Sequence, residues 1–199
     1  SLLDILGRFM HLQVEEKRIS TDKGIKKLRK ELMIFPRYHQ LDCVRKLIAH
    51  SRQHGAGRNY LVQHSAGSGK SNSIAWMAHR LSCLHDIADE QIFDSVVVVT
   101  DRQVLDRQLQ DTIYQFDHKQ GVVQKIDEDS KQLAAALASG TPIVITTLQK
   151  FPFISEALEK LNKDAKNDES KVAITTQGKR FAVIIDEAHS SQSDESAIE

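Results

Sequence analysis

Three short, unbroken apolar runs constrain the fold of this chain more than any other feature. They occupy residues 96–99 (VVVV), 143–145 (IVI) and 181–185 (FAVII). Runs that are apolar on both faces are typical of central strands in a parallel sheet that helices cover on both sides. A briefer run at residues 60–62 predicts one more strand.

Amphipathic patterns fill the intervals between these runs. Apolar residues recur at helical spacing in residues 41–49, 74–84, 104–116, 133–137 and 154–161. Strand and helix alternate along the chain, which favours right-handed crossovers between parallel strands. The sequence therefore predicts an α/β domain with a mostly parallel central sheet and helices on both faces.

Two segments fall outside this alternation. Residues 1–34 read as a short helical segment with an apolar start and a basic run at Lys23, Lys26, Lys27, Arg29 and Lys30. The run predicts a solvated helix face, and a stripe that binds DNA phosphates is the alternative. Residues 162–180 are polar and predict a surface loop, with a short strand at 172–175.

The overall charge restricts the classes of function. Formal net charge is zero, whereas a stand-alone nucleic-acid binder is usually basic, so any nucleic-acid surface must be local. No apolar run approaches the roughly 20 residues that span a bilayer, and the N-terminus lacks a secretory pattern. With only Cys43 and Cys83, predicted as reduced thiols, we expect a cytoplasmic location and no membrane partner.

A glycine-rich stretch indicates a phosphate-binding loop. It comprises Ser65, Ala66, Gly67, Ser68, Gly69, Lys70 and Ser71, between a predicted strand and a predicted helix. Free N–H groups at a helix start attract phosphate, Lys70 would reach the β- and γ-phosphates of ATP, and Ser71 would offer its hydroxyl to Mg²⁺. The alternative is a glycine turn with a surface lysine.

The loop departs from the full pattern at one position. His64 stands where the first glycine of the pattern is expected. A residue other than glycine suits this position if its φ is negative, and the groups expected to touch phosphate lie between Gly67 and Ser71. His64 therefore weakens the match without removing a phosphate contact.

A pair of acidic residues after a predicted strand complements the phosphate loop. The run at 181–185 ends in Asp186-Glu187-Ala188-His189, which places two carboxylates at the carboxyl edge of the predicted sheet. We expect Asp186 to hold Mg²⁺ partly through water, and Glu187 to orient and deprotonate the attacking water. His189 would link the nucleotide site to a polynucleotide site.

These two motifs resemble motifs I and II of helicase superfamily two. More narrowly, the pieces "RYHQ", "VQHSAGSGKSNSIAW", "VVVVTDRQVLDRQL" and "IIDEAHSSQS" resemble the motor of the R (restriction) subunit of type I restriction enzymes. In that family a histidine precedes the loop. The resemblance covers about residues 35–199 and implies a RecA-like, DEAH-type motor domain. Residues 1–34 look like the connector that follows the family's nuclease domain.

The resemblance also implies roles for residues outside the two motifs. Arg37 and Gln40 resemble the adenine-reading motif, because an amide pairs with both the donor and the acceptor on adenine. Thr100, Asp101, Arg102 and Thr147 resemble motifs that contact the DNA backbone, and ordinary strand-end capping is the alternative.

The implied activity is an ATP-dependent double-stranded DNA translocase within a restriction endonuclease, with methylation and specificity subunits as partners. The second RecA-like domain and the family's arginine finger do not occur in the sequence, so we expect this chain alone to bind ATP weakly and hydrolyse it poorly. The alternatives are another superfamily-two helicase or translocase, a phosphate-loop kinase, and a non-catalytic nucleotide-dependent interaction module.

Overall fold

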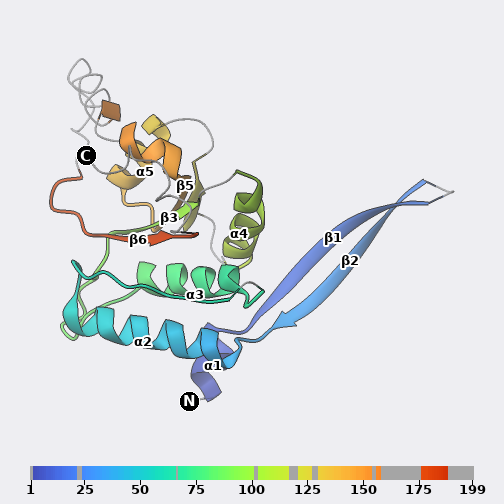
Figure 1. Ribbon diagram of the computed structural model, residues 1–199, viewed down its shortest axis with the longest axis horizontal. Coiled ribbons are helices and arrows are strands. Elements are labelled where there is room, and N and C mark those ends of the chain that lie inside the picture. The colour runs from blue at the N-terminus through green and yellow to red at the C-terminus, as the bar shows by residue number, and fades with distance from the viewer. Residues whose placement is uncertain are drawn as a thin grey trace.

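The computed structural model describes residues 2–21, 24–65, 67–100, 103–116, 121–126, 130–153, 156–157 and 176–187. At its centre lies a four-stranded parallel sheet in the order β4-β5-β3-β6 (Figure 1). These strands are β3 (Ser95–Thr100), β4 (Val123–Lys125), β5 (Ile143–Thr147) and β6 (Phe181–Ile185). The three apolar runs are strands, as predicted, but β6 lies at the edge of the described sheet and not at its centre, and its Val183 and Ile185 are exposed.

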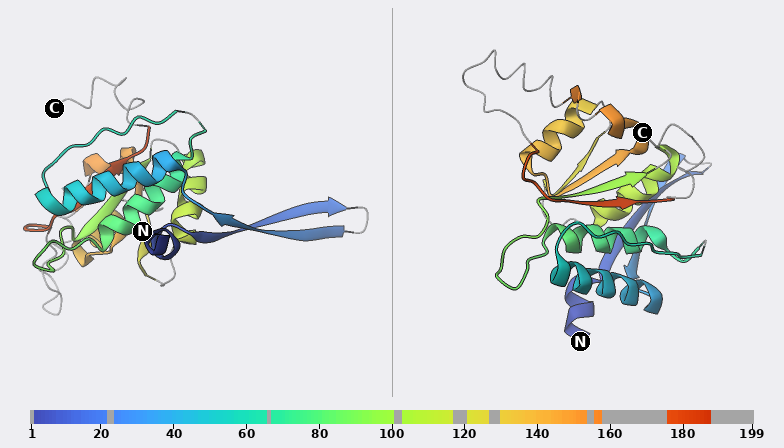
Figure 2. Two further views of the ribbon diagram at one scale, coloured as in Figure 1. Left: turned by 90° about the horizontal axis from the view of Figure 1, so that it is seen from below. Right: turned by 60° about the vertical axis from the view of Figure 1, so that its left-hand side comes forward.

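Helices cover both faces of the sheet. On one face lie α3 (Lys70–Ser82) and α4 (Gln103–Gln115), packed against Val96 and Val98 of β3, and α2 (Tyr38–His54) packs on the outer side of α3 (Figure 1). On the other face lie α5 (Ser130–Ser139) and the 3₁₀ helix η1 (Leu148–Phe153), with α5 packed against Val97 and Val99. Alternate residues of one strand thus enter two cores. Figure 2 shows from two further sides that helices lie on both faces of the sheet. The predicted α/β fold is confirmed and is consistent with a RecA-like domain.

The prediction of a helical segment over residues 1–34 is wrong beyond its first turns. Helix α1 (Leu2–Arg8) is followed by a long antiparallel hairpin of β1 (His11–Thr21) and β2 (Gly24–Ile34). We call this hairpin the arm; it projects from the body of the domain (Figures 1 and 2). Charged residues interrupt the β-branched positions of both strands, which weakens the strand pattern in the sequence, and Gly24, the register partner of Thr21, is the local signal for a hairpin.

The base of the arm belongs to the main core. The Trp76 indole Nε1 donates a hydrogen bond to the Phe9 carbonyl at 2.8 Å. The His11 side chain is buried, and its ring centroid lies 3.6 Å from that of Phe116. These contacts fix the direction in which the arm leaves the domain. Residues before the predicted domain boundary at residue 35 therefore pack against residues after it.

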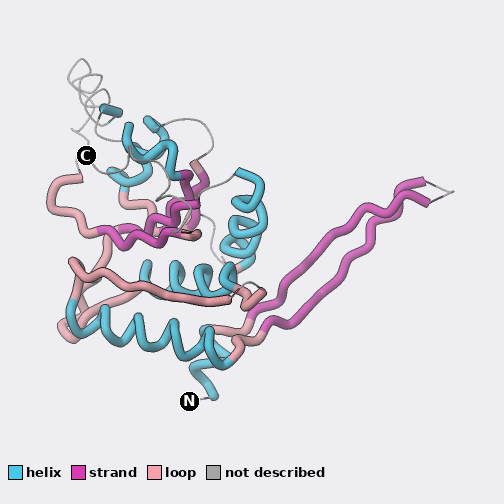
Figure 3. The backbone as a smooth tube through the Cα atoms, viewed as in Figure 1, coloured by secondary structure: helices cyan, strands magenta, loops and turns pink. Residues whose placement is uncertain are grey.

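The predicted strand at residues 60–62 is also wrong. The chain between α2 and α3 runs back as an extended loop (Figure 3), and Leu61 is 89% exposed. A side-chain contact ties this loop to α2, since the Tyr60 hydroxyl lies 2.8 Å from Nδ1 of His50. A strand needs a partner for its backbone groups, and none of the four described sheet strands pairs with this segment.

Other predictions fall partly outside the described residues. Of the predicted helix at 154–161, Glu156 and Ala157 are described and helical, and the predicted strand at 172–175 is not described. Both cysteines are free thiols, as predicted. Within the described ranges, no helix combines the length and the apolar character that crossing a membrane requires.

Candidate nucleotide site

The phosphate loop adopts a left-handed backbone at both of its glycines. Gly67 has φ of 73° and Gly69 has φ of 81°, a region that L side chains seldom occupy. Gly69 is the N-cap of α3, and Lys70 and Ser71 form the first helical turn. The first N–H groups of a helix have no partner within it, so this end of α3 presents donors and a positive dipole to an anion.

Three side chains at the start of α2 hold the loop from behind. Gln40 Nε2 donates to the carbonyls of Gly69 at 2.8 Å and Ser68 at 3.2 Å. His39 Nε2 lies 3.1 Å from the Ser68 carbonyl, and an Arg37 guanidinium nitrogen donates to the Gly67 carbonyl at 3.3 Å. We call Arg37, His39 and Gln40 the bracket. It binds the carbonyl side of the loop, which leaves the N–H side for a ligand.

The bracket changes the expected role of Gln40. Its side chain is only 2% exposed, and its Oε1 accepts a hydrogen bond from the Arg37 backbone N–H at 2.8 Å. Both ends of the amide are thus engaged within the protein, one with the loop and one with its own helix start. In this state Gln40 positions the loop, and adenine contact by Arg37 or Gln40 stays a prediction.

His64 packs against His39 of the bracket, and the sequence motif indicated only His64. The His39 and His64 rings meet edge to face, with centroids 5.1 Å apart at an interplanar angle of 90°. The bond from His39 to the Ser68 carbonyl requires the proton on Nε2. His64 therefore packs behind the loop, and His39 was missed although it stands next to Gln40.

The acidic strand end meets the loop in space. Asp186 donates its backbone N–H to the Val99 carbonyl at 2.9 Å, which continues the β6–β3 pairing by one residue. Glu187 then turns with φ of 53°, an unusual left-handed conformation for a residue other than glycine. Its carboxylate Oε1 forms an ion pair with Lys70 Nζ, 117 residues away in sequence. The predicted meeting of the two motifs is confirmed.

The two predicted threonines of the DNA-backbone motifs lie on the same edge. Thr100 ends β3, Thr147 ends β5, and the two are register partners. Both are buried, and within the described residues the Thr100 hydroxyl has no hydrogen-bond partner. The predicted residues Ala66, Asp101, Arg102 and His189 lie outside the described part of the chain. DNA contact at this edge therefore stays a prediction.

The ionised form of the Asp186 carboxyl group is destabilised in this arrangement. Burial raises the pKa of its carboxyl above the ordinary value of 3.8, and the neighbouring Glu187 carboxylate raises it further, against the opposing effect of Lys70. A carboxylate in such a position favours a nearby cation. The site therefore has the charge that a divalent ion would neutralise.

We expect Asp186→Asn to stabilise the chain at neutral pH. A raised pKa in the folded state means that the carboxylate form is penalised there, so stability falls as pH rises through the ordinary value of 3.8. Removing the carboxyl should raise the free energy of unfolding at pH 7 by less than about 1 kcal/mol, because the group is only half buried. The difference from wild type should vanish below pH 3.8, as measured by urea denaturation at both pH values without Mg²⁺.

The side chains present fit a magnesium ion held jointly with phosphate. Ser71, in the first turn of α3, supplies a hydroxyl, and Asp186 supplies a carboxylate. No cluster of three or more His, Cys, Asp or Glu occurs in the described ranges, so these residues do not form an all-protein cage. Mg²⁺ commonly binds through one or two protein oxygens together with water and substrate phosphates.

The comparisons with known proteins agree with this geometry. A search of curated proteins found no match to the chain. A family model described as SWI2/SNF2 ATPase matches residues 39–199, which include most of the bracket, the whole loop and the acidic strand end. That span is well over half of the sequence. The chain belongs to the SWI2/SNF2 ATPase family.

Proposed function

We propose that this chain is the nucleotide-binding half of an ATP-dependent double-stranded DNA translocase, of the kind found in the R subunit of type I restriction enzymes. The observation that carries the motor assignment is the contact between Lys70 and Glu187. It brings a phosphate-binding cation and a candidate base together at the carboxyl edge of a parallel sheet. The four sequence pieces that include His64 and the residues after Asp186 support the narrower restriction assignment.

Each side chain has a distinct part in the proposed chemistry. The N–H groups at the start of α3 would bind the phosphates, and Lys70 would neutralise the β- and γ-oxygens. Mg²⁺, held by Ser71 and Asp186, would supply further charge neutralisation on the transferred phosphoryl group. Glu187 would orient the attacking water and accept its proton once Lys70 turns to the nucleotide.

The ion pair between Lys70 and Glu187 holds both side chains at the nucleotide site. Lys70 and Glu187 are each about one-third exposed, and such pairs contribute less than about 1 kcal/mol. ATP can therefore displace Glu187 from Lys70 at little cost. The same displacement frees the carboxylate for water, so binding of the substrate would release the base.

Lys70→Ala provides the direct test of the nucleotide site. We expect its affinity for a fluorescent ATP analogue with Mg²⁺ to fall roughly 10- to 100-fold, because a charge-assisted contact contributes about 1.5–3 kcal/mol. Lys46→Ala is the matched control, since Lys46 is an exposed lysine paired with Asp42 on α2. Equal affinity of wild type and Lys70→Ala in an equilibrium titration would refute the nucleotide site.

The type of polynucleotide separates the restriction motor from other superfamily-two enzymes. A duplex DNA motor should show a change in ATP-analogue affinity on addition of duplex DNA and none on addition of an RNA duplex of equal length. The opposite preference would favour an RNA helicase. A nucleotide-binding module without catalysis would bind ATP but show no single-turnover hydrolysis, with or without DNA.

A further inference from the structure

We propose that the outer half of the arm binds the phosphate backbone of duplex DNA. By the outer half we mean residues 17–21 of β1 and 24–28 of β2. This inference rests on the proposed DNA motor for its choice of polyanion, but its evidence is separate from the nucleotide site. It comes from the position, charge and strand register of the arm.

Basic and acidic residues are distributed unevenly along the arm. The outer half carries four basic residues and no acidic one: Lys17, Arg18, Lys26 and Lys27. The inner half, residues 11–16 and 29–34, carries three acidic residues and two basic ones. Because the whole chain has a formal net charge of zero, the four unbalanced positive charges are a local feature of the outer half.

The strand register explains why the inner half needs no partner. It places Glu15 opposite Lys30 and Glu16 opposite Arg29, so each of these acidic positions has a basic register partner. Arg29 also forms an ion pair with Glu31 at 2.8 Å. The inner half therefore neutralises its own charge within the hairpin.

The outer half has the opposite arrangement. Arg18 stands opposite Lys27 in the register, and like charges directly opposite each other destabilise a strand pair. A single two-stranded hairpin is at best marginally stable in water, and the outer half stands clear of the described body of the domain in Figure 1 and in the left view of Figure 2. A polyanion would relieve the repulsion and supply the missing stabilisation.

Duplex DNA matches the dimensions of the outer half, in which the register places Arg18 and Lys27 on one face of the ribbon and Lys17 and Lys26 on the other. Five residues of a strand extend over roughly 16 Å, and a duplex carries one phosphate charge per roughly 1.7 Å of its axis. A two-stranded ribbon is also narrow enough for the major groove. Lysine and arginine contacts to phosphate carry no sequence information, so we expect binding without sequence preference.

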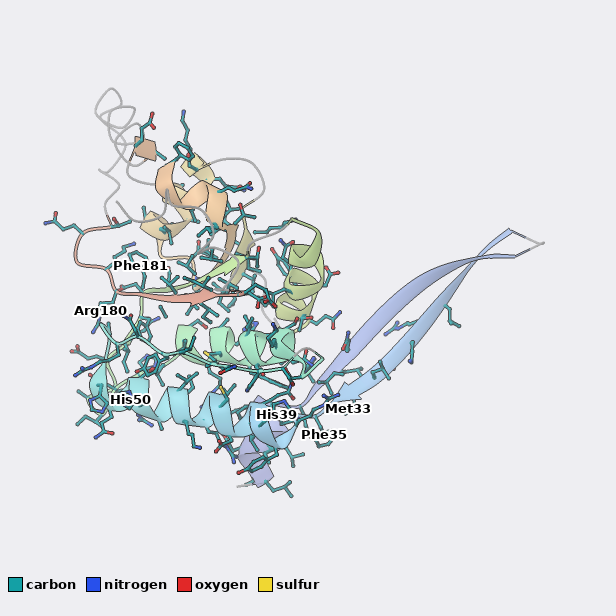
Figure 4. The ribbon with its side chains drawn as sticks, in the orientation of Figure 1. Met33, Phe35, His39, His50, Arg180 and Phe181 are labelled. Carbon is teal, nitrogen blue, oxygen red and sulfur yellow. The ribbon has the colours of Figure 1, made fainter. Side chains whose placement is uncertain are left out.

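The base of the arm connects this surface to the nucleotide site. β2 ends at Ile34, three residues before Arg37 of the bracket. Figure 4 labels Met33, Phe35 and His39 together at this end of α2, whereas Arg180 and Phe181 lie at the opposite end of the domain. DNA held by the arm would therefore lie on the side of the domain where the phosphate loop is held.

Charge neutralisation with a matched control tests the proposal. The test variant combines four substitutions in the outer half of the arm: Lys17→Gln, Arg18→Gln, Lys26→Gln and Lys27→Gln. The control variant combines four substitutions of exposed residues on the domain body: Lys46→Gln, Arg52→Gln, Arg58→Gln and Lys131→Gln. Both variants lose four positive charges. Fluorescence anisotropy with a labelled 30-base-pair duplex, without nucleotide, measures affinity over a range of salt concentrations.

We expect the arm variant to bind roughly 10- to 100-fold more weakly near 0.1 M salt, and the control to bind as wild type does. The slope of log affinity against log salt should fall by about 3 to 4 units, which corresponds to four lost phosphate contacts. Equal weakening in both variants would show a general charge effect and overturn the proposal, as would unchanged binding in the arm variant.

Two further measurements keep the result interpretable. A variant in which two residues, Asn-Gly, replace residues 17–28 keeps the Glu16–Arg29 pair and should lose the same binding, so misfolding of the substituted strands cannot explain the loss. Poly-glutamate that competes with duplex at equal charge concentration would indicate an acidic protein partner and refute DNA. The DNA titrations contain no ATP analogue. A negative result for the nucleotide site with Lys70→Ala is therefore distinguishable from a negative result for DNA binding by the arm.

Discussion

Glu187→Gln should retain nucleotide binding while lowering the rate of hydrolysis about 10²- to 10⁴-fold. That range is the usual contribution of a positioned general base. The amide keeps the shape of the carboxylate and can orient water, but it accepts no proton. Single-turnover hydrolysis with protein in excess over ATP measures the rate even where turnover is slow.

The same substitution should increase affinity for ATP. In the free protein Glu187 is paired with Lys70, and binding of phosphate has to break that pair. A pair that is about one-third exposed contributes less than about 1 kcal/mol, so its loss should increase affinity by up to about 5-fold. Glu90→Gln, which removes an exposed carboxylate far from the loop in sequence, is the control and should change neither quantity. Weaker binding by Glu187→Gln, or hydrolysis at the wild-type rate, would contradict the assigned role.

Gly69→Ala should distort the phosphate loop and destabilise the chain by roughly 2–4 kcal/mol. A Cβ atom at Gly69 would lie 2.6 Å from Gln40 Nε2, well inside van der Waals contact. The left-handed φ of 81° adds about 1–2 kcal/mol for any L side chain. Gln40 can retreat only by losing its bonds to the loop, at about 0.5–1.5 kcal/mol each.

Gly67→Ala is a close control for this prediction. Gly67 also has a left-handed φ, of 73°, but a Cβ atom there would meet nothing within 4 Å. It should therefore show the backbone strain alone. Urea denaturation measures stability, and titration with a fluorescent ATP analogue should show at least a 10-fold loss for Gly69→Ala beyond that for Gly67→Ala.

A double-mutant cycle isolates the contact between the loop and the bracket. Gln40→Ala removes the amide that a new Cβ would strike, so Gly69→Ala should cost less in that background. We expect a coupling free energy of about 1–2 kcal/mol, the part of the effect that exceeds backbone strain. Strict additivity of the two substitutions would show that Gln40 does not hold the loop.

The fold could be predicted to the extent that its elements have strong local patterns. The runs at 96–99 and 143–145 are buried on both faces and form strands, because the transfer of apolar side chains from water to the core is favourable. The run at 181–185 also forms a strand, but it lies at the edge of the described sheet, and Val183 and Ile185 are exposed. The same logic failed at residues 60–62, where apolar residues lie exposed on a loop. Apolar content alone does not supply the hydrogen-bonding partner that a strand requires.

For the arm, prediction from the sequence was limited by a different factor. Charged residues interrupt its apolar positions, and it lies against no described core beyond its base, so hydrophobic periodicity carried little information. What separates a hairpin from a helix there is the pairing of β1 with β2, a non-local choice made across the turn.

The sequence by itself determined the parallel sheet, the phosphate loop and the two carboxylates that end β6, since each depends on residues close together in the chain. Only the tertiary structure decided that Lys70 pairs with Glu187 and that His39 and Gln40 hold the loop from behind. These contacts join segments 29 to 117 residues apart. They arise because packing of helices on a sheet fixes side-chain positions that no local pattern records.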